Sequence, residues 1–384
     1  MTAASIPNSG AFAAPTSAPI SAPSFESISP GPLLAMSGSY WSGCTLHAGV
    51  VLDVFTPLAE GPATPQDLAP RLGCDARALA MLLRALCSLG ILLRSGGVYG
   101  LTEAAREFLL PASPRSVCHI IRHHHHLVQS FARMDESVRS GRANRSGVGA
   151  GETAREDFLL GMFNLAMGIA PGLAAQLDGL LAAAGLPKLP ERARMLDLGG
   201  GPGTYAIQFC LANPGLAAVI YDLPGTRPVA EATVARFGVT GRVAFHPGDY
   251  TTDELPGGFD LAWLSQILHG EDPATATDLV RRAAAALAPG GVLLVHEFLL
   301  DDQKDDGQAD GTQDGPAFAA LFSLNMLLGT AGGQAYAEGE VRRMFEDVGL
   351  TLVQRLDFVG PNDSGIIAGV KPGRGQVKPG PGQG

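Results

Sequence analysis

The chain has 384 residues, of which 46% are hydrophobic, and its formal net charge is −10. This length and hydrophobic content are sufficient for two or three domains with separate cores. The negative charge argues against nucleic acid or an anionic membrane as the main partner. The five cysteines form no CxxC pair, which disfavours a disulfide framework or a zinc site. Because no run of about 18 apolar residues and no signal peptide is present, we expect a soluble cytoplasmic protein.

Three segments are expected to lack regular structure. Residues 1–32 are rich in Ala, Pro and Ser and carry one charged side chain, Glu26. Such a composition buries too little apolar surface to fold, so this segment is predicted to be a disordered arm. Residues 372–384 are rich in Gly and Pro and are predicted to be a disordered tail. The aspartate-rich stretch Asp301–Asp314 is predicted to be a solvated loop.

The first folded block, residues 33–114, has the pattern of a winged helix. Leu46–Leu58 is predicted to be one apolar helix. The segment ILLRSGGVYGL reads as a strand, a Gly-Gly turn and a second strand. Three further helices are predicted to begin directly after residues that cap helix N-termini, namely Thr64, Asp75 and Thr102. Residues 115–192 continue as mostly helical sequence.

From residue 193 to residue 371 the pattern changes to short apolar strands that alternate with helices. This alternation predicts a Rossmann-like α/β domain with a mostly parallel, seven-stranded sheet covered on both faces. The last two strands are joined by a short loop and can form an antiparallel hairpin at the sheet edge. The seven expected strands are ARMLDLG, LAAVIYDL, RVAFHPGD, FDLAWLSQ, GVLLVHEFLL, LTLVQRLDF and GIIAGVK.

The segment MLDLGGGPGTYAIQF indicates a ligand site. Its first strand ends at Asp197, glycines follow from Gly199 to Gly203, and a helix begins near Thr204. Glycines allow the backbone to turn sharply and to approach a ligand, and the helix N-terminus offers unpaired N–H groups. A glycine loop of this kind could serve a dinucleotide or S-adenosyl-L-methionine.

Three aspartates at the ends of successive strands favour S-adenosyl-L-methionine. Asp197 would repel a pyrophosphate but would attract a cationic sulfonium or ammonium group. Asp222 ends the second strand, where a carboxylate can accept hydrogen bonds from both ribose hydroxyls of an adenosine. Asp249 ends the third strand, where it can receive an adenine amino group. A strand-end aspartate can also be a simple turn residue, but three beside one glycine loop favour a cofactor site.

These motifs resemble a known family. Residues 193–371 look like a class I methyltransferase domain, and LAPGGVLLVHEF resembles its strand after a Pro-Gly-Gly turn. The span from about 33 to 371, with LSQILHGEDP, resembles the O-methyltransferases related to caffeate, acetylserotonin and bacterial aromatic-polyketide enzymes. The resemblance implies that residues 33–114 form a dimerisation domain, that residues 115–192 line the acceptor pocket, and that the enzyme is a homodimer.

The resemblance also assigns site residues. It implies that His269 is the general base and that Glu297 orients it. A phenol has a pKa of ~10 and an imidazole ~6.5, so the proton must leave as the methyl group is transferred. No metal is expected. The predicted cofactor contacts are Asp197, Gly199, Gly201, Asp222, Asp249, Tyr250 and Ser265, and the predicted acceptor contacts are Met162, Met326 and His123.

The sequence departs from the family pattern at two positions. Gly270 stands where an Asp usually follows the base, and Ala335 replaces a second orienting acid; Glu338 and Glu340 are better explained as helix N-terminal acids. Weaker support of His269 leaves open C-methylation, or non-methylating hydroxylation or decarboxylation of a polyketide-like substrate. A ligand-sensing winged-helix DNA-binding regulator is the alternative from another class.

The histidine run His123–His126 permits two interpretations. Adjacent histidines on a helix point in different directions, whereas His119 and His123 are spaced to share a metal ion. We expect instead that Arg122 or His123 reaches the acceptor.

Overall fold

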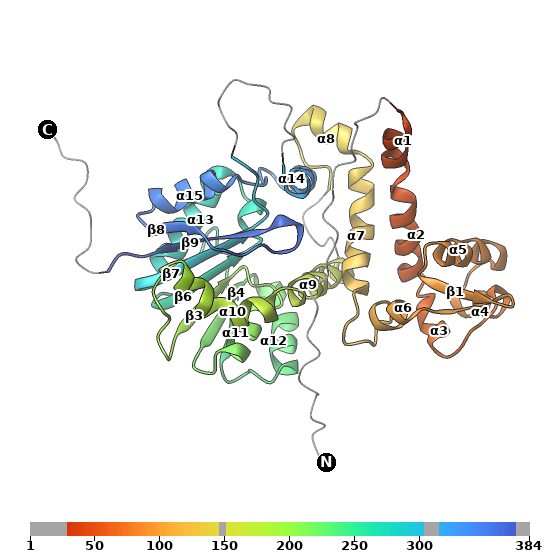
Figure 1. Ribbon diagram of the computed structural model, residues 1–384, viewed down its shortest axis with the longest axis horizontal. Coiled ribbons are helices and arrows are strands. Elements are labelled where there is room, and N and C mark those ends of the chain that lie inside the picture. Colours follow the sequence, from red (N-terminus) through yellow and green to blue (C-terminus); the bar gives the residue numbers. More distant parts are fainter. Residues whose placement is uncertain (1–28, 146–150, 303–314, 374–384) are drawn as a thin grey trace, which may run out of the picture. The chain divides into compact units, whose positions relative to one another are not determined.

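The computed structural model describes residues 29–145, 151–302 and 315–373 (Figure 1). Most of the predicted arm, tail and acidic loop therefore lies outside the described residues. The first helix begins at Gly31, so the last two residues of the predicted arm are helical. The described chain divides into two units. A helical unit extends to Leu165 and includes Leu327–Gly329, and a sheet unit holds Ala166–Met326 and the residues from Thr330 onward.

The helical unit contains the predicted winged-helix pattern. The three predicted caps are confirmed, because each side chain accepts a hydrogen bond from the first turn of its helix. The hairpin turns at Gly96 and Gly97, whose positive φ angles of 54° and 90° suit glycine. The elements in chain order are α1 (Gly31–Gly38), α2 (Tyr40–Val51), α3 (Phe55–Ala59), α4 (Pro65–Leu72), α5 (Ala76–Ser88), β1 (Leu92–Ser95), β2 (Val98–Leu101) and α6 (Glu103–Phe108).

The prediction of one helix over Leu46–Leu58 is wrong. Asp53 adopts a left-handed φ of 52°, which breaks the helix between α2 and α3. The Asp53 carboxylate accepts a 2.7 Å hydrogen bond from the Thr56 hydroxyl at the start of α3. The break lets Phe55 and Leu58 enter the core of this unit, where both are at most 1% exposed.

Three longer helices complete the helical unit: α7 (Cys118–Phe131), α8 (Met134–Ser140) and α9 (Glu152–Met167). Helix α7 packs along α2. Gly161 of α9 lies directly against the backbone of Ile120 in α7, since a Cβ there would be 3.1 Å from the Ile120 Cα. The helical stretch predicted for residues 115–192 is thus divided, with α7, α8 and most of α9 in this unit and α10 (Ala170–Ala183) in the sheet unit.

The sheet unit has the predicted α/β fold. Its seven strands are arranged in the order β5-β4-β3-β6-β7-β9-β8. All pairs from β5 to β7 are parallel, whereas β9 is antiparallel to both β7 and β8, so the predicted edge hairpin is confirmed. The strands are β3 (Arg194–Leu198), β4 (Ala217–Asp222), β5 (Val243–Pro247), β6 (Phe259–Ser265), β7 (Leu287–Glu297), β8 (Thr351–Arg355) and β9 (Gly365–Val370).

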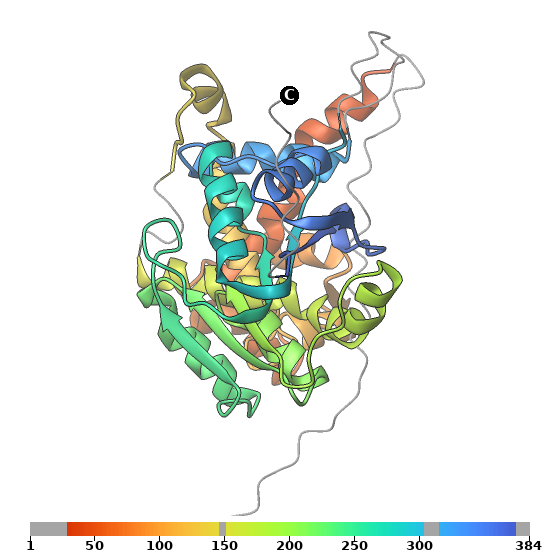
Figure 2. The same cartoon turned by 90° about the vertical axis from the view of Figure 1, so that its left-hand side faces the viewer.

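Helices cover both faces of this sheet (Figures 1 and 2). On one face, α10, α11 and α12 pack on side chains such as Met195 and Trp263. On the other face, α13 and α15 pack on their strand neighbours, such as Leu196 and Leu264. Alternate residues of one strand therefore enter different cores, which explains the continuous apolar runs. The remaining helices are α11 (Thr204–Ala212), α12 (Arg227–Arg236), α13 (Pro273–Ala286), α14 (Ala317–Gly329) and α15 (Glu338–Asp347).

No single helix in the described ranges is long and apolar enough to cross a membrane, although α9 and α10 taken together as a bent pair pass by length and composition.

Candidate active site

The glycine loop after β3 is held in a shape that glycine alone accommodates. Gly199, Gly201 and Gly203 have φ angles of 66°, 52° and 77°. A Cβ on Gly199 would lie 2.7 Å from the Ile267 side chain, and one on Gly203 would collide with Ile220. A Cβ on Gly200 would lie 2.7 Å from the Asp197 carboxyl carbon. The loop therefore closes over Asp197 before α11 begins at Thr204.

Asp197 is a buried carboxylate that lacks a cationic partner among the described residues. It is 1% exposed, and its Oδ2 accepts a 3.1 Å hydrogen bond from the Ala206 N–H. Burial raises the pKa of Asp197 to about 7, and the nearby Asp222 charge adds to the rise. A ligand that brings a positive charge to this carboxylate would stabilise its ionised form.

Asp222, at the end of β4, connects the loop to the neighbouring strand. Its carboxylate accepts hydrogen bonds from the Gly201 N–H at 2.8 Å, the Leu223 N–H at 2.7 Å and the Thr226 hydroxyl at 2.9 Å. Burial nevertheless raises its pKa. Asp197, the glycine loop and Asp222 thus lie together, as the sequence predicts.

The next predicted residues follow β5, which is paired with β4. Asp249 accepts hydrogen bonds from the Thr251 N–H and hydroxyl at 2.9 and 2.6 Å. The Tyr250 hydroxyl donates to Glu271 at 3.1 Å. Two buried oxygens, Thr204 Oγ1 and Gln266 Oε1, have no hydrogen-bond partner in the described parts of the chain. This edge of the sheet therefore offers acids and unpartnered acceptors that fit a cationic ligand with hydroxyl and amino groups.

His269 and Glu297 form a contact between the ends of two adjacent strands. His269 lies in a short 3-10 helix, Leu268–Gly270, shortly after β6, and Glu297 ends β7. The His269 Nδ1 lies 2.8 Å from the Glu297 Oε2, and the other Glu297 oxygen accepts from the Leu268 N–H at 2.9 Å. Glu297 is 2% exposed. The Phe322 ring of α14 packs edge-on against the imidazole, with centroids 4.7 Å apart.

Comparisons with known proteins agree with this geometry. A model described as the O-methyltransferase domain matches residues 165–351, and one described as the O-methyltransferase dimerisation domain matches residues 34–111. The 3-hydroxy-5-methyl-1-naphthoate 3-O-methyltransferase of Streptomyces sahachiroi is 31% identical over 88% of this chain and 94% of its own length. The chain belongs to the O-methyltransferase family.

Two further similarities support the assignment of this O-methyltransferase. The tetracenomycin polyketide synthesis 8-O-methyltransferase of Streptomyces glaucescens is 31% identical over 88% of this chain and 96% of its own. A solved structure of PigF with SAH has a TM-score of 0.77 and is 27% identical, and the similarity covers 90% of this chain and 100% of that chain. The family's methyl donor is S-adenosyl-L-methionine.

The two departures from the family pattern, Gly270 and Ala335, concern the support of His269. No second carboxylate pairs with His269 within the described ranges, but Glu297 also accepts from the His269 N–H at 3.5 Å. Ala335 is 4% exposed and its N–H donates to Ser323. Glu338 and Glu340 lie in the first turn of α15, and Glu340 accepts from the Ala337 N–H, so their prediction as helix N-terminal acids is confirmed.

The predicted acceptor contacts are distributed over two units. Met326 lies in α14 of the sheet unit and is 8% exposed. Met162 in α9 and His123 in α7 belong to the helical unit. The His123 ring packs on Phe158 with centroids 5.3 Å apart, and burial lowers the pKa of His123 to about 4. These three residues remain predicted acceptor contacts.

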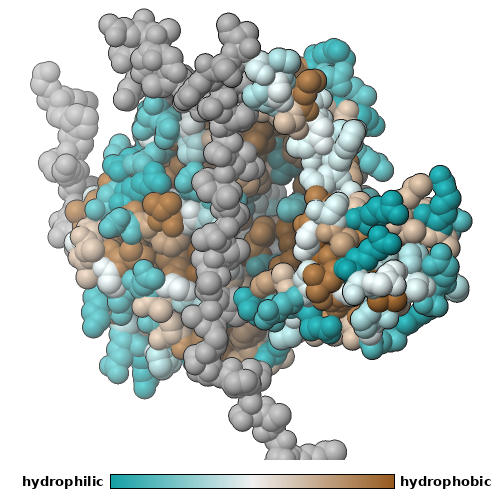
Figure 3. Space-filling view, turned by 45° about the vertical axis from the view of Figure 1, so that its right-hand side comes forward, coloured by the Kyte–Doolittle hydropathy of each residue, from teal (hydrophilic) through white to brown (hydrophobic). Residues whose placement is uncertain are grey.

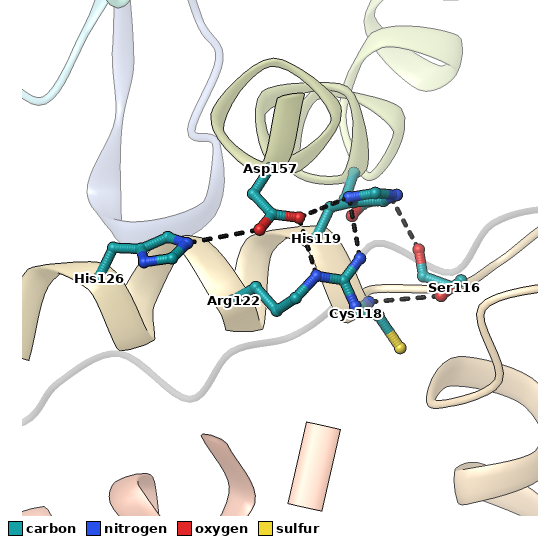
Figure 4. A network of polar contacts seen from close by, with 7 residues as sticks. Ser116, Cys118, His119, Arg122, His126 and Asp157 are labelled. Atoms are coloured by element: carbon teal, nitrogen blue, oxygen red, sulfur yellow. Dashed lines mark hydrogen bonds and ion pairs between the residues drawn. The ribbon is translucent and has the colours of Figure 1, made fainter. Parts of the chain in front are cut away.

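Asp157 of α9 is a buried residue that the sequence analysis missed (Figure 4). It is 3% exposed and receives the Arg122 guanidinium at 2.8 Å, the His119 ring at 2.9 Å and the His126 ring at 3.4 Å. Arg122 and His119 are therefore bound inside the helical unit. No group of three or more metal-binding side chains is found among the described residues. One signal was available: Asp157 is an acid directly before the apolar run FLLGMF.

Proposed function

We propose that this enzyme transfers a methyl group from S-adenosyl-L-methionine to a hydroxyl group of a small aromatic or conjugated acceptor. The observation that carries the proposal is the contact of His269 with Glu297 beside the glycine loop. The two curated relatives described above are named for O-methylation of a naphthoate and of a polyketide, which supports a fused or conjugated aromatic acceptor.

The cofactor contacts follow from the chemistry of the strand ends. Asp197 and the glycine loop at Gly199 and Gly201 would hold the amino acid part, and Asp222 the ribose. Asp249, Tyr250 and Ser265 would surround the adenine and its approach. The raised pKa values of Asp197 and Asp222 support a cationic, hydroxyl-bearing ligand at this position. When bound, S-adenosyl-L-methionine supplies an electrophilic methyl group on a positively charged sulfur.

His269 would act as the general base. Its Nδ1 is bound to Glu297, which fixes the ring orientation and leaves Nε2 to accept the acceptor's proton. Glu297 would also stabilise the imidazolium that forms. A phenol with a pKa of ~10 is a poor nucleophile while it is protonated. The His269 base would therefore take the proton as the oxygen–carbon bond forms.

We further propose a homodimer formed through residues 34–111. Several large apolar side chains on α1 and α2 are exposed, including Leu34 and Trp41 at 69% each and Tyr40 at 62%. Figure 3 shows that hydrophobic residues reach the surface among hydrophilic ones on one face of the molecule. Exposed side chains of this size on a matched dimerisation domain support association with a second copy.

The absence of acids at positions 270 and 335 leaves a second reaction as an alternative. Gly270 and Ala335 leave Glu297 as the carboxylate that supports His269 among the described residues, and weaker support suits C-methylation or a non-methylating reaction. The contacts of Glu297 with Leu268 and His269 argue for O-methylation, because this single carboxylate orients both the ring and its backbone.

The deciding experiment uses methyl-13C S-adenosyl-L-methionine with a panel of hydroxynaphthoates. Carbon NMR of the product separates a methoxy carbon from a carbon-bound methyl group. We expect a methoxy product, with turnover reduced ~10²–10⁴-fold in His269→Ala and less in Glu297→Gln. S-adenosylhomocysteine affinity should change little in either variant. A carbon-bound methyl group, or an His269→Ala variant as active as the parent, would contradict the proposal.

A further inference from the structure

We propose that His296, the residue before Glu297 on β7, is a positioning residue for the segment 265–269 that carries His269. This inference rests on the proposed function in one respect only, that the segment belongs to the catalytic site.

Three polar contacts connect His296 to its surroundings. Its Nδ1 lies 2.9 Å from the Ser265 hydroxyl, and its Nε2 lies 3.0 Å from the Ser364 hydroxyl. Its backbone carbonyl accepts a 2.9 Å hydrogen bond from the Gln266 N–H. His296 is 1% exposed and Ser364 is fully buried. The imidazole therefore connects the partly buried end of β6 to the buried turn that precedes β9.

Adjacent residues of β7 hold the segment from opposite faces of the sheet. Successive side chains of a strand point in opposite directions. The His296 side chain binds Ser265 on one face, whereas the Glu297 side chain binds Leu268 and His269 on the other. The His296 carbonyl accepts from the Gln266 N–H between them. The segment is thus fixed at its start by His296 and at its end by Glu297.

The backbone of this segment needs such support. Gln266 has a φ of 59°, in the left-handed region that non-glycine residues rarely adopt. A sparsely populated conformation persists where surrounding contacts determine it. The contacts of His296 with Ser265 and Gln266 lie immediately beside this strained residue.

The His296 ring suits a neutral connecting role. It stacks on Trp263, with centroids 5.8 Å apart and planes at 24°. Burial lowers the pKa of His296 to about 4, so the ring is neutral near pH 7, with one nitrogen donating and the other accepting. Serine hydroxyls both donate and accept, so the Ser265–His296–Ser364 chain can be satisfied in full. An apolar side chain would leave two serine hydroxyls without this partner.

The test distinguishes the contact of Nδ1 with Ser265 from the contact of Nε2 with Ser364. In His296→Asn the amide can occupy the Nδ1 position near Ser265, and in His296→Gln it can occupy the Nε2 position near Ser364. His296→Leu keeps neither hydrogen bond. The matched control is His246→Asn, which changes an exposed histidine on β5. Hydrogen exchange by mass spectrometry reports on peptides covering 264–270, urea unfolding reports on global stability, and calorimetry reports S-adenosylhomocysteine affinity.

We expect exchange at 264–270 to rise about tenfold in His296→Leu and in His296→Gln, and to stay near the parent rate in His296→Asn. S-adenosylhomocysteine affinity should follow the same order. If exchange follows global stability alone, with Asn and Gln variants equivalent, His296 is a packing residue and the proposal is wrong. Ser265→Ala, which removes one hydroxyl only, gives the same readout if the histidine variants do not fold. Because no methyl transfer is measured, this outcome is independent of whether His269 is the base.

Discussion

Replacing Asp197 by Asn separates the cost of a buried acid from its use in ligand binding. The pKa of Asp197 rises from 3.8 to about 7 because of burial. At ~1.36 kcal/mol per pKa unit, this shift corresponds to about 4 kcal/mol by which ionised Asp197 destabilises the ligand-free protein above pH 8. Asn has nearly the same shape and can still accept the Ala206 N–H, but it carries no charge.

The sign of the pH dependence follows from the direction of the shift. A raised pKa means that the folded state binds the proton more tightly than the unfolded state. The contribution of Asp197 to stability is therefore full below pH ~4 and is lost as the pH rises through about 7. Asp197→Asn should gain stability over the parent, and the gain should grow by about 2 kcal/mol between pH 5.5 and 8.5.

The assay is urea unfolding at both pH values, with and without S-adenosylhomocysteine. Without ligand the variant should be the more stable protein at pH 8.5. With ligand the stability advantage of the variant should shrink or reverse, because loss of the carboxylate should weaken ligand binding about tenfold or more. Equal pH dependence of parent and variant would refute the burial argument. Unchanged affinity would refute the assignment of Asp197 to the cofactor.

Three other predictions follow from the same structure. His296→Gln should make the unfolding free energy less dependent on pH below 6.5. Because the pKa of His296 is lowered to about 4, the parent should lose ~3 kcal/mol of unfolding free energy as the pH falls from 6.5 to 4; the same loss in parent and variant would contradict this. Asp157→Asn should lower the unfolding free energy by ~3–5 kcal/mol by leaving Arg122 without its buried partner, whereas Asp135→Asn, an exposed control, should change little. Trp41→Glu should shift light scattering toward the monomer, while Leu352→Glu, on β8 and 55% exposed against 69% for Trp41, should not; a parent that is already monomeric would exclude the dimer.

Much of the fold was predictable because local and global signals agree. The caps Thr64, Asp75 and Thr102 each satisfy a backbone donor within their own first turn, so they need no tertiary information. The strands of the sheet are buried on both faces and are therefore continuously apolar, which predicts a central sheet between two helical layers. Asp53 shows the limit. Its left-handed conformation interrupts an apolar stretch that reads as one helix, and its residue type alone does not reveal that break.

Contacts between residues far apart in the sequence were harder to predict. His119 and Asp157 are 38 residues apart, and His296 and Ser364 are 68 apart. Each contact depends on how elements pack, which hydrophobic periodicity does not determine. His269 and Glu297 were paired in advance through the family resemblance, and the structure places them 2.8 Å apart. Periodicity by itself predicts only that both follow strands.

The two buried acids of the site differ in a way that indicates what each is for. Glu297 accepts hydrogen bonds from the Leu268 N–H and from both the ring and the N–H of His269, so the protein itself satisfies it. Asp197 accepts one hydrogen bond, from the Ala206 N–H, among the described residues, and its pKa rises to about 7. A carboxylate satisfied by the chain orients the chain, whereas a buried carboxylate left short of donors and cations is stabilised by a ligand that supplies them. On this argument we expect Glu297 to support His269 as the proposed base and Asp197 to bind the cofactor.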